Sequence, residues 1–400
     1  MDTLKNDNDG TKNNNFKNQK PAGEKIVIIG GISAGTSAAA KARRFSEEAE
    51  IVIYEKYKYI SYATCGLPYY VSEKISGPDD LIVTTVRQFE LRFNVKVNVL
   101  CEVIKIDPSS KSLTIRNLET GNVFSDNYGK LIIATGTAAL SFNQELLTLK
   151  NVFSLRTVDD ALQLKKYMNK SIVEKPEASS VVIIGGGYIG LELLEAFFSK
   201  DYKVTIIEKT SQILPVFDKE IIEYIENYLL EKGVVILKEE EVKEIQRDDS
   251  GILTKIITSK GTGIAADIVI LSIGTRPETK IAGDCGIAIG EFGGIKVNEF
   301  LQTNIADIYA AGDCCECKNF TNDKKQSFNL ASIANIQGRC AGYNAAGGIS
   351  KYIDAIPTSI IKILDITIGK TGMTLKEAKG AGLAAKKIEL HALNHAEYYP

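Results

Sequence analysis

Tryptophan is absent from this 400-residue sequence, and histidine occurs only as His391 and His395. This scarcity nearly excludes a histidine-based catalytic triad or a histidine-rich metal site in the body of the chain, so no metal site is expected. No stretch approaches the roughly 18 consecutive apolar residues of a transmembrane helix. The net charge of −2 gives no indication of nucleic-acid binding, which normally shows a basic face.

Apolar residues are almost missing from the first 23 residues, which are rich in Asn, Asp and Lys. This segment lacks the apolar core of a signal peptide and cannot bury enough surface to offset the cost of ordering. We therefore expect residues 1–23 to form a disordered tail. A reducing, cytoplasmic location follows as the default, and the seven cysteines are expected to be free thiols or functional groups.

Two stretches of the sequence, 25–44 and 181–198, share one pattern. Each contains a short apolar strand, a glycine turn and a helix, and the next apolar strand ends in an acidic residue, Glu55 or Glu208. This is the βαβ layout of a dinucleotide-binding unit. The sequence therefore predicts an α/β fold with two Rossmann-like dinucleotide-binding domains.

The second glycine turn is a full G-x-G-x-x-G formed by Gly185, Gly187 and Gly190. The first glycine permits the tight turn, the second lets the backbone approach a pyrophosphate, and the third lets helix and strand pack closely. Glu208 lies where a carboxylate can hold a ribose 2′-hydroxyl. A carboxylate there repels a 2′-phosphate, which favours NADH while leaving NADPH possible.

The first glycine turn departs from this pattern, because Gly30 and Gly35 match but Ile32 occupies the second glycine position. Taken alone, the turn could be a merely structural connection between strand and helix. Glu55, at the end of the next strand, favours a ribose-binding role.

Further apolar runs are typical of buried parallel strands, and two amphipathic stretches predict helices. Past Gly348 the pattern changes to strand-like pieces and a short helix, which suggests a third, α+β domain. The predicted strands are 131–134, 268–271, 308–310, 359–364 and 366–368, and the predicted helices are 158–168, 218–232 and 375–379.

Cys65 lies in the segment Ser61-Tyr-Ala-Thr-Cys-Gly-Leu-Pro-Tyr69, and a helical segment is expected to follow it. A cysteine at a helix start is near the positive end of the helix dipole, which stabilises its thiolate. The alternative is a small buried hydrophobic residue. Cys65 has no partner cysteine at C-x-x-C or C-x4-C spacing, so redox chemistry at Cys65 would use one thiol and a substrate sulfur, or a sulfenic acid.

Several motifs in order give the chain, from about Lys25 to Pro400, a specific resemblance. It resembles the single-cysteine branch of the pyridine nucleotide-disulfide oxidoreductases, most of all the coenzyme A-disulfide reductases, with NADH oxidases, NADH peroxidases and persulfide reductases as relatives. The motifs are the first glycine turn, the Cys65 segment, Ala134-Thr-Gly136, Gly185-Gly-Gly-Tyr-Ile-Gly-Leu-Glu192, Ser272-Ile-Gly-Thr-Arg-Pro277, Tyr309-Ala-Ala-Gly-Asp313 and Leu330-Ala-Ser-Ile-Ala-Asn-Ile-Gln-Gly-Arg339.

The resemblance implies FAD and a nicotinamide cofactor, and a division into 24–150 (FAD, first part), 151–275 (NAD), 276–347 (FAD, second part) and 348–400 (start of a dimerisation domain). Asp313 would hydrogen-bond the flavin's ribityl chain, closing the FAD site with Gly30, Gly35, Glu55 and Lys56. Glu192 would lie near the nicotinamide. Both Asp313 and Glu192 could instead be ordinary loop or helix-start carboxylates.

The resemblance also implies a small sulfur substrate, namely CoA disulfide, CoA persulfide or polysulfide. Ser37, Lys41 and Arg44 share one helical face by their spacing, and with Ser61 and Thr64 they match the family's coenzyme A contacts; the alternative is a solvated charged helix end. Thr64 replaces the usual Asn. Ser33 stands where the oxidases and peroxidases carry His, which argues against oxygen or peroxide chemistry.

Residues 391–400 resemble the family's C-terminal dimerisation domain, which implies a homodimer and a possible substrate-site role for Tyr398 and Tyr399. The chain stops inside that domain, so a fragment is one expectation. Cys314, Cys315 and Cys317 are expected to be incidental loop thiols. Two other functions stay open, an NADH oxidase or peroxidase and a non-catalytic flavin-binding redox sensor.

Overall fold

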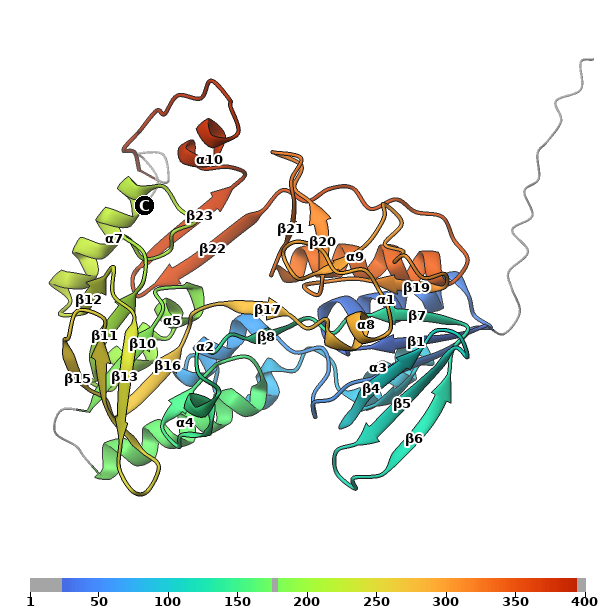
Figure 1. Cartoon of the computed structure of the whole chain (residues 1–400), viewed down its shortest axis with the longest axis horizontal. Coiled ribbons are helices and arrows are strands. Elements are labelled where there is room, and N and C mark those ends of the chain that lie inside the picture. Colours follow the sequence, from blue (N-terminus) through green and yellow to red (C-terminus); the bar gives the residue numbers. More distant parts are fainter. Residues whose placement is uncertain (1–23, 175–178, 394–400) are drawn as a thin grey trace, which may run out of the picture.

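The chain is described here by a computed structural model that covers residues 24–174 and 179–393. Two lobes lie side by side, each built on a parallel sheet (Figure 1). The predicted α/β fold with two Rossmann-like units is confirmed. The predicted tail 1–23 and the tyrosines Tyr398 and Tyr399 lie outside the described residues.

The first lobe contains a five-stranded sheet in the order β19-β7-β1-β2-β3, and all its neighbours are parallel. Alternate residues of a strand point to opposite faces. Ile26 and Ile28 therefore pack under α1 and α9, whereas Val27 and Ile29 pack against the antiparallel sheet β4-β5-β6. The strands and helices of this lobe are β1 (Lys25–Ile29), α1 (Ser33–Phe45), β2 (Glu50–Tyr54), η1 (Thr64–Gly66), α2 (Leu67–Val71), η2 (Pro78–Leu81), α3 (Val86–Phe93), β3 (Lys96–Asn98), β4 (Cys101–Asp107), β5 (Ser112–Asn117), β6 (Val123–Asn127), β7 (Lys130–Ile133), α8 (Lys280–Asp284), β18 (Ile295–Lys296), β19 (Ile308–Ala310), β20 (Cys315–Lys318), β21 (Lys325–Ser327) and α9 (Ala331–Ala345).

Helices α1 and α9 approach each other closely because small residues line their contact. A Cβ added to Gly338 would lie 2.2 Å from the carbonyl oxygen of Ala34. A Cβ added to Gly342 would lie 2.1 Å from that of Ala38. This contact joins the first glycine turn to a helix about 300 residues later in the chain, and so fixes α1 against the sheet.

The second lobe repeats this plan with the sheet β12-β11-β10-β16-β9, again parallel throughout. Val181 and Ile183 pack with helices α4 to α7, whereas Val182 and Ile184 face the antiparallel sheet β13-β14-β15. Its elements are η3 (Gln144–Thr148), β9 (Val152–Phe153), α4 (Val158–Glu174), β10 (Ser180–Ile184), α5 (Tyr188–Glu192), α6 (Leu194–Phe198), β11 (Lys203–Glu208), α7 (Lys219–Glu231), β12 (Val235–Lys238), β13 (Val242–Arg247), β14 (Leu253–Thr258), β15 (Gly263–Ala265) and β16 (Ile268–Leu271).

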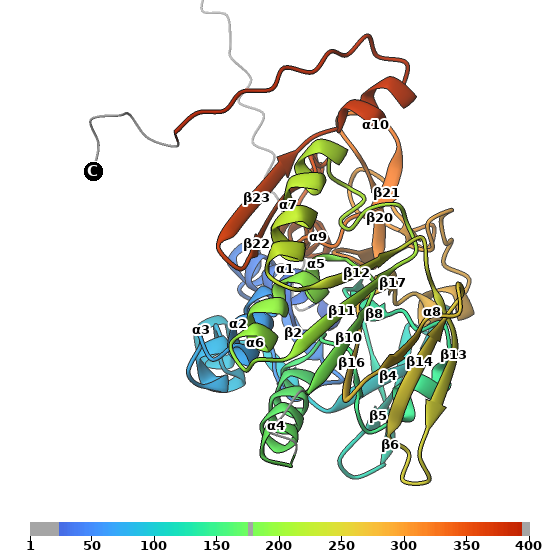
Figure 2. The same cartoon turned by 90° about the vertical axis from the view of Figure 1, so that its left-hand side faces the viewer.

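A two-stranded antiparallel link, β8 (Thr137–Ala139) with β17 (Thr275–Pro277), crosses from one lobe to the other (Figure 1). After the first lobe is completed by α9, the chain forms a hairpin of β22 (Thr358–Ile363) and β23 (Ile366–Thr371), followed by α10 (Leu375–Gly380). Figure 2 shows this hairpin alongside α7 of the second lobe. The boundaries given for the four domains in the sequence remain predictions.

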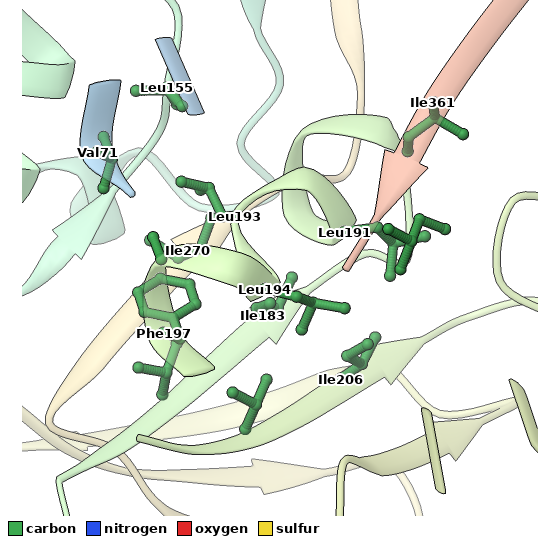
Figure 3. Packing of buried hydrophobic residues seen from close by; sticks show 14 of the residues in the cluster. Val71, Leu155, Ile183, Leu191, Leu193, Leu194, Phe197, Ile206, Ile270 and Ile361 are labelled. Atoms are coloured by element: carbon green, nitrogen blue, oxygen red, sulfur yellow. The ribbon is translucent and has the colours of Figure 1, made fainter. Parts of the chain in front are cut away.

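One hydrophobic cluster ties α2 to the second lobe and to the hairpin (Figure 3). It joins Val71 of α2, Leu155, Phe197 of α6 and Ile361 of β22, all of which are buried. The segment that carries Cys65 belongs by sequence to the first lobe, yet its helix packs against the second. This packing fixes the position of Cys65 relative to both sheets.

The predicted strands at 268–271 and 308–310 are confirmed as β16 and β19, and the predicted helix at 158–168 extends to Glu174. The loop expected for Cys315 and Cys317 is wrong, because both are buried in strand β20, whereas Cys314 lies in the turn before that strand and is buried too. Within 24–174 and 179–393, no helix is long and apolar enough to cross a membrane.

Candidate dinucleotide and thiol site

A cavity of about 1390 Å³ runs between the lobes. It exceeds the roughly 300–1,000 Å³ of a pocket for one drug-sized ligand. Both glycine turns border it, and so do Cys65, Glu192 and Asp313. The residues singled out by the sequence as cofactor and redox groups therefore share one continuous space.

The first glycine turn is fixed by backbone contacts. Gly30 has a φ of +106°, and an added Cβ would lie 2.2 Å from the carbonyl oxygen of Ala134. At Gly35 an added Cβ would lie 1.8 Å from the carbonyl oxygen of Gly30. Ile32, at the second glycine position, borders the cavity and packs against the hydrophobic cluster of the second lobe.

Glu55 follows β2 directly and is buried beside this turn. Its Oε2 accepts the backbone N–H of Gly31 at 2.6 Å, and its Oε1 accepts that of Tyr57 at 2.9 Å. Burial raises the pKa of Glu55, and the two backbone donors oppose this shift. The carboxylate thus lies at the cavity wall in a fixed orientation.

The second glycine turn has the same construction. Gly185 has a φ of +95°, and a Cβ added to it would lie 2.5 Å from the carbonyl oxygen of Ser272. The hydroxyl of Ser272 also accepts the N–H of Gly190 at 3.0 Å. Oε2 of Glu208 accepts the N–H of Gly186 at 2.8 Å. Oε1 of Glu208 accepts the N–H and the hydroxyl of Thr210 at 2.7 and 2.8 Å.

Asp313 carries a buried oxygen without a partner. Within the described part of the chain its Oδ1 is shielded from solvent and has no hydrogen bond. Burial raises the pKa of Asp313 to about 6, against the opposing charge of Arg156. An unsatisfied buried acceptor is costly, and a hydroxyl donor would relieve it. Asp313 therefore fits the polyhydroxyl chain of a flavin.

Asp313 is held in place by α9. The preceding residue, Gly312, has a φ of +85° and donates its N–H to Oε1 of Gln337 at 2.7 Å. Gln337 is almost completely buried and lies in α9, within the family motif that runs from Leu330 to Arg339. Its positioning contact could not be inferred from the sequence, because the two residues are 25 positions apart.

Cys65 lies in the short helical turn η1, immediately before α2, and is exposed. The expected helical segment after Cys65 is confirmed by α2. Thr64, Leu67 and Pro68 border the same cavity. Cys65 therefore borders the space that both glycine turns enclose, and it is exposed to a substrate.

Glu192 is the last residue of α5, in the opposite lobe, and its burial raises its pKa to about 7. Cys65 and Glu192 border the same cavity from the two lobes. Between them in sequence, Tyr69 of α2 has a pKa raised by burial and further by the negative charge of Glu192. The cavity is thus bordered by an exposed thiol and by a carboxyl group with a raised pKa.

The predicted coenzyme A contacts divide into two groups. Thr64 borders the cavity, and so does Lys56 of the predicted FAD site. Ser37, Lys41, Arg44 and Ser61 lie outside the cavity lining. The first three lie on one continuous helix, α1, so their spacing places them on one side of it. The hydroxyl of Ser37 donates to Oδ1 of Asn335 at 2.9 Å. Nζ of Lys41 lies 5.0 Å from the ring centre of Tyr343, and Cζ of Arg44 lies 5.6 Å from that of Phe93.

Cys314, just before β20, and Cys315, its first residue, are both engaged by backbone groups. The thiols of Cys314 and Cys315 donate to the carbonyl oxygens of Ala311 and Gly312 at 3.4 and 3.2 Å, and burial raises the pKa of both. Across the described ranges, no group of three or more His, Cys, Asp or Glu side chains is placed to hold a metal ion.

Comparison with known proteins gives a consistent picture. The family described as pyridine nucleotide-disulphide oxidoreductase matches residues 24–338. The chain is 34% identical, over 94% of its length and 82% of the relative's, to an NAD(P)H coenzyme A polysulfide/persulfide reductase of Pyrococcus horikoshii. It is 32% identical, with the same coverage, to an NADH oxidase of Methanocaldococcus jannaschii. The reduced Bacillus anthracis CoADR-RHD structure matches with a TM-score of 0.88 and 35% identity, over 95% of this chain and 67% of that one.

Proposed function

The chain belongs to the pyridine nucleotide-disulphide oxidoreductase family, and we propose that it reduces a disulfide or persulfide of coenzyme A, or a polysulfide, with NADH through Cys65. Membership implies an oxidoreductase that uses FAD and NAD(P)H. One observation carries the proposal: a shared cavity is bordered by two dinucleotide turns, an exposed thiol and a carboxyl group with a pKa of about 7.

The residues of the first lobe would hold FAD, and those of the second would hold NADH. Gly30, Glu55, Lys56 and Asp313 border the FAD side, Gly35 lies behind them in the same turn, and the unsatisfied Oδ1 of Asp313 supports this assignment. The NADH side consists of Gly185, Gly187, Gly190 and Glu208. FAD, when bound, supplies the relay of two electrons from nicotinamide to sulfur.

Cys65 supplies the nucleophile. Its thiolate attacks one sulfur of the substrate, which forms a mixed disulfide and releases the first thiol. Two electrons from NADH then break the Cys65–sulfur bond and release the second thiol, so that one disulfide, one NADH and one proton give two thiols and NAD⁺. With a persulfide the products are one thiol, hydrogen sulfide and NAD⁺.

No second cysteine is needed for this cycle. Among the described cysteines Cys65 alone is exposed, Cys285 is half-buried and the others are buried. Glu192 would take up or release a proton as the charge of the neighbouring reactants changes during the reaction. Its pKa of about 7 allows both protonation states near neutral pH.

Coenzyme A would approach along the face of α1 beside α9, over Ser37, Lys41 and Arg44, with its sulfur end reaching Thr64 and Cys65. Arg is well suited to phosphate recognition through paired hydrogen bonds, and Ser61 lies in the turn that leads to Cys65. We further propose a cytoplasmic homodimer, in which Tyr398 and Tyr399 stay candidates for a substrate-site role.

An NADH oxidase is the second candidate, because the relative from Methanocaldococcus jannaschii bears that name. Ser33 borders the cavity at the position where His is expected for oxygen or peroxide chemistry. The presence of Ser33 favours the sulfur substrate over oxygen.

NADH oxidation by the FAD-loaded protein tests the proposal, measured without oxygen for each sulfur acceptor and for peroxide, and in air-saturated buffer for oxygen. We expect turnover with CoA disulfide, CoA persulfide or polysulfide, and much slower NADH consumption when oxygen or peroxide is the acceptor. Faster turnover with oxygen than with every sulfur acceptor would overturn the assignment in favour of the oxidase. Reduction of the flavin without turnover on any acceptor would indicate a redox sensor.

A further inference from the structure

The turn between β12 and β13 lies beside Glu208 and brings a second carboxylate to it. The N–H of Glu240 donates to the carbonyl oxygen of Glu208 at 3.1 Å, and the N–H of Glu239 donates to that of Thr210 at the same distance. Strand β12 also pairs with β11 in register, with Lys238 opposite Glu208. The backbone of the turn is therefore fixed against the end of β11.

Glu240 is an unusual residue in this turn because it is 7% exposed. Within the described chain its Oε2 is shielded from solvent and has no hydrogen-bond partner. The nearest cation, Nζ of Lys260, lies 3.9 Å from the other oxygen, Oε1, and the Lys260 side chain is more than half exposed. A buried carboxylate oxygen without a donor is costly unless a ligand supplies one.

Glu240 borders two connected spaces. One is the main cavity, which also contains Glu208. The other is a smaller pocket of about 360 Å³, lined by Lys209, Ser211, Glu239, Glu240, Glu241 and Ser259. Lys209 is paired with Glu241 at 2.9 Å, so the glutamates outnumber the cation at this end of the nucleotide site.

Glu208 and Glu240 differ in the number of hydrogen bonds that their carboxylate oxygens already accept. Glu208 already accepts three hydrogen bonds from Gly186 and Thr210, which fix the glycine turn. Glu240 has an oxygen that no described group uses. Glu240 therefore has an acceptor to offer a ligand in the cavity that it borders.

We propose that Glu240 is a second determinant of nucleotide choice, accepting a hydrogen bond from a ribose hydroxyl of the adenosine half of NADH and repelling a 2′-phosphate. This inference rests on the proposed binding of NADH by the second lobe. A ribose hydroxyl supplies the donor that the carboxylate lacks, whereas a phosphate adds charge to a region that already contains several carboxylates.

Isothermal titration of the FAD-loaded protein with NAD⁺ and with NADP⁺ tests the proposal. Glu240→Gln removes the charge and keeps an acceptor, so we expect NADP⁺ to bind about tenfold more tightly and NAD⁺ to change less than about threefold. Glu240→Ala removes the acceptor as well, so NAD⁺ should weaken by about tenfold. The control is Glu244→Gln on the exposed face of β13, which removes the same charge outside the cavity and should leave both affinities unchanged.

Thermal unfolding and the flavin absorption spectrum show whether each variant is folded. If the NAD⁺ and NADP⁺ affinities of folded Glu240→Gln and Glu240→Ala stay within about twofold of the parent protein, the inference is wrong. Failure of the proposed function looks different, because the parent protein would then not be reduced by NADH at all.

Discussion

The carboxylate of Glu208 accepts the backbone N–H of Gly186 at 2.8 Å, across the second glycine turn. Glu55 accepts the N–H of Gly31 at 2.6 Å across the first. The two lobes thus repeat one arrangement. In each βαβ unit, the acid at the end of the second strand accepts a hydrogen bond from the glycine turn that follows the first strand. A change at either acid is expected to alter the turn as well as the contact with a ribose.

Glu208→Ala removes one hydrogen bond to the second glycine turn, from Gly186, and two from Thr210 after β11. We expect the KM for NADH to rise by about tenfold or more, because hydrogen bonds to charged groups contribute about 1.5–3 kcal/mol each. The FAD content should stay near that of the parent protein, because Glu208 lies in the other lobe. Steady-state kinetics and the flavin absorbance measure both effects, and an unchanged KM would contradict a role for Glu208 in NADH binding.

Asp313→Asn tests the FAD side. Loss of the carboxylate should weaken FAD binding by about tenfold or more, which equilibrium dialysis measures. The substitution should also increase the free energy of unfolding of the apoprotein at pH 7.5. Burial raises the pKa of Asp313 to about 6, above its usual 3.8, so the folded state binds the proton more tightly than the unfolded state does.

The sign of this effect follows from proton linkage. Stability of the parent apoprotein falls as pH rises from about 4 to about 6, and the loss then stays constant. At one pKa unit per 1.36 kcal/mol the penalty is about 3 kcal/mol at most. Urea unfolding of parent and variant at pH 4 and pH 7.5 measures this penalty. If the free energy of unfolding changes equally between the two pH values in both proteins, Asp313 is not desolvated.

Glu192→Gln tests the carboxyl group with a pKa of about 7. In the parent protein, the rate constant of flavin reduction by NADH should change with an inflection near pH 7, because Glu192 loses its proton there. The Gln variant should lose this inflection while keeping its FAD. A stopped-flow pH profile makes the comparison, and an inflection that persists in the variant would assign it to another group.

Gly342→Ala tests the contact between α1 and α9. The added Cβ would lie 2.1 Å from the carbonyl oxygen of Ala38, so the helices must separate, at a cost of about 1–3 kcal/mol. We expect a lower Tm and weaker FAD retention. Gly380→Ala is the matched control, because no atom lies within 4 Å of its added Cβ, and it should leave the Tm unchanged.

The sequence predicted those parts of the structure that depend on local pattern. Gly30 and Gly185 were recognisable because a strand, a tight turn and a helix are consecutive in the chain. The partner of Gly312, by contrast, is the distant Gln337, and the presence of Cys65 and Glu192 on one cavity depends on how α2 packs against the second lobe. Such contacts join residues far apart in sequence, and no periodicity records them.

Two errors have physical causes. Cys315 and Cys317 were expected in a loop with Cys314, but a thiol is small and apolar enough to be buried in a strand. Glu240 was overlooked because it lies in an acidic run that resembles a solvated surface. Its burial follows from the pairing of β12 with β11, which only the folded chain shows.

The most direct test of the single-thiol account separates the two halves of the reaction in Cys65→Ser. Anaerobic stopped-flow should show that NADH still reduces the flavin of this variant at close to the parent rate, because that step does not use the thiol. Turnover with CoA disulfide or persulfide should fall below about a thousandth of the parent value, since Ser cannot form the mixed disulfide. Cys285→Ser, the half-buried control, should keep most of its activity. Full turnover with CoA disulfide by Cys65→Ser would contradict the account.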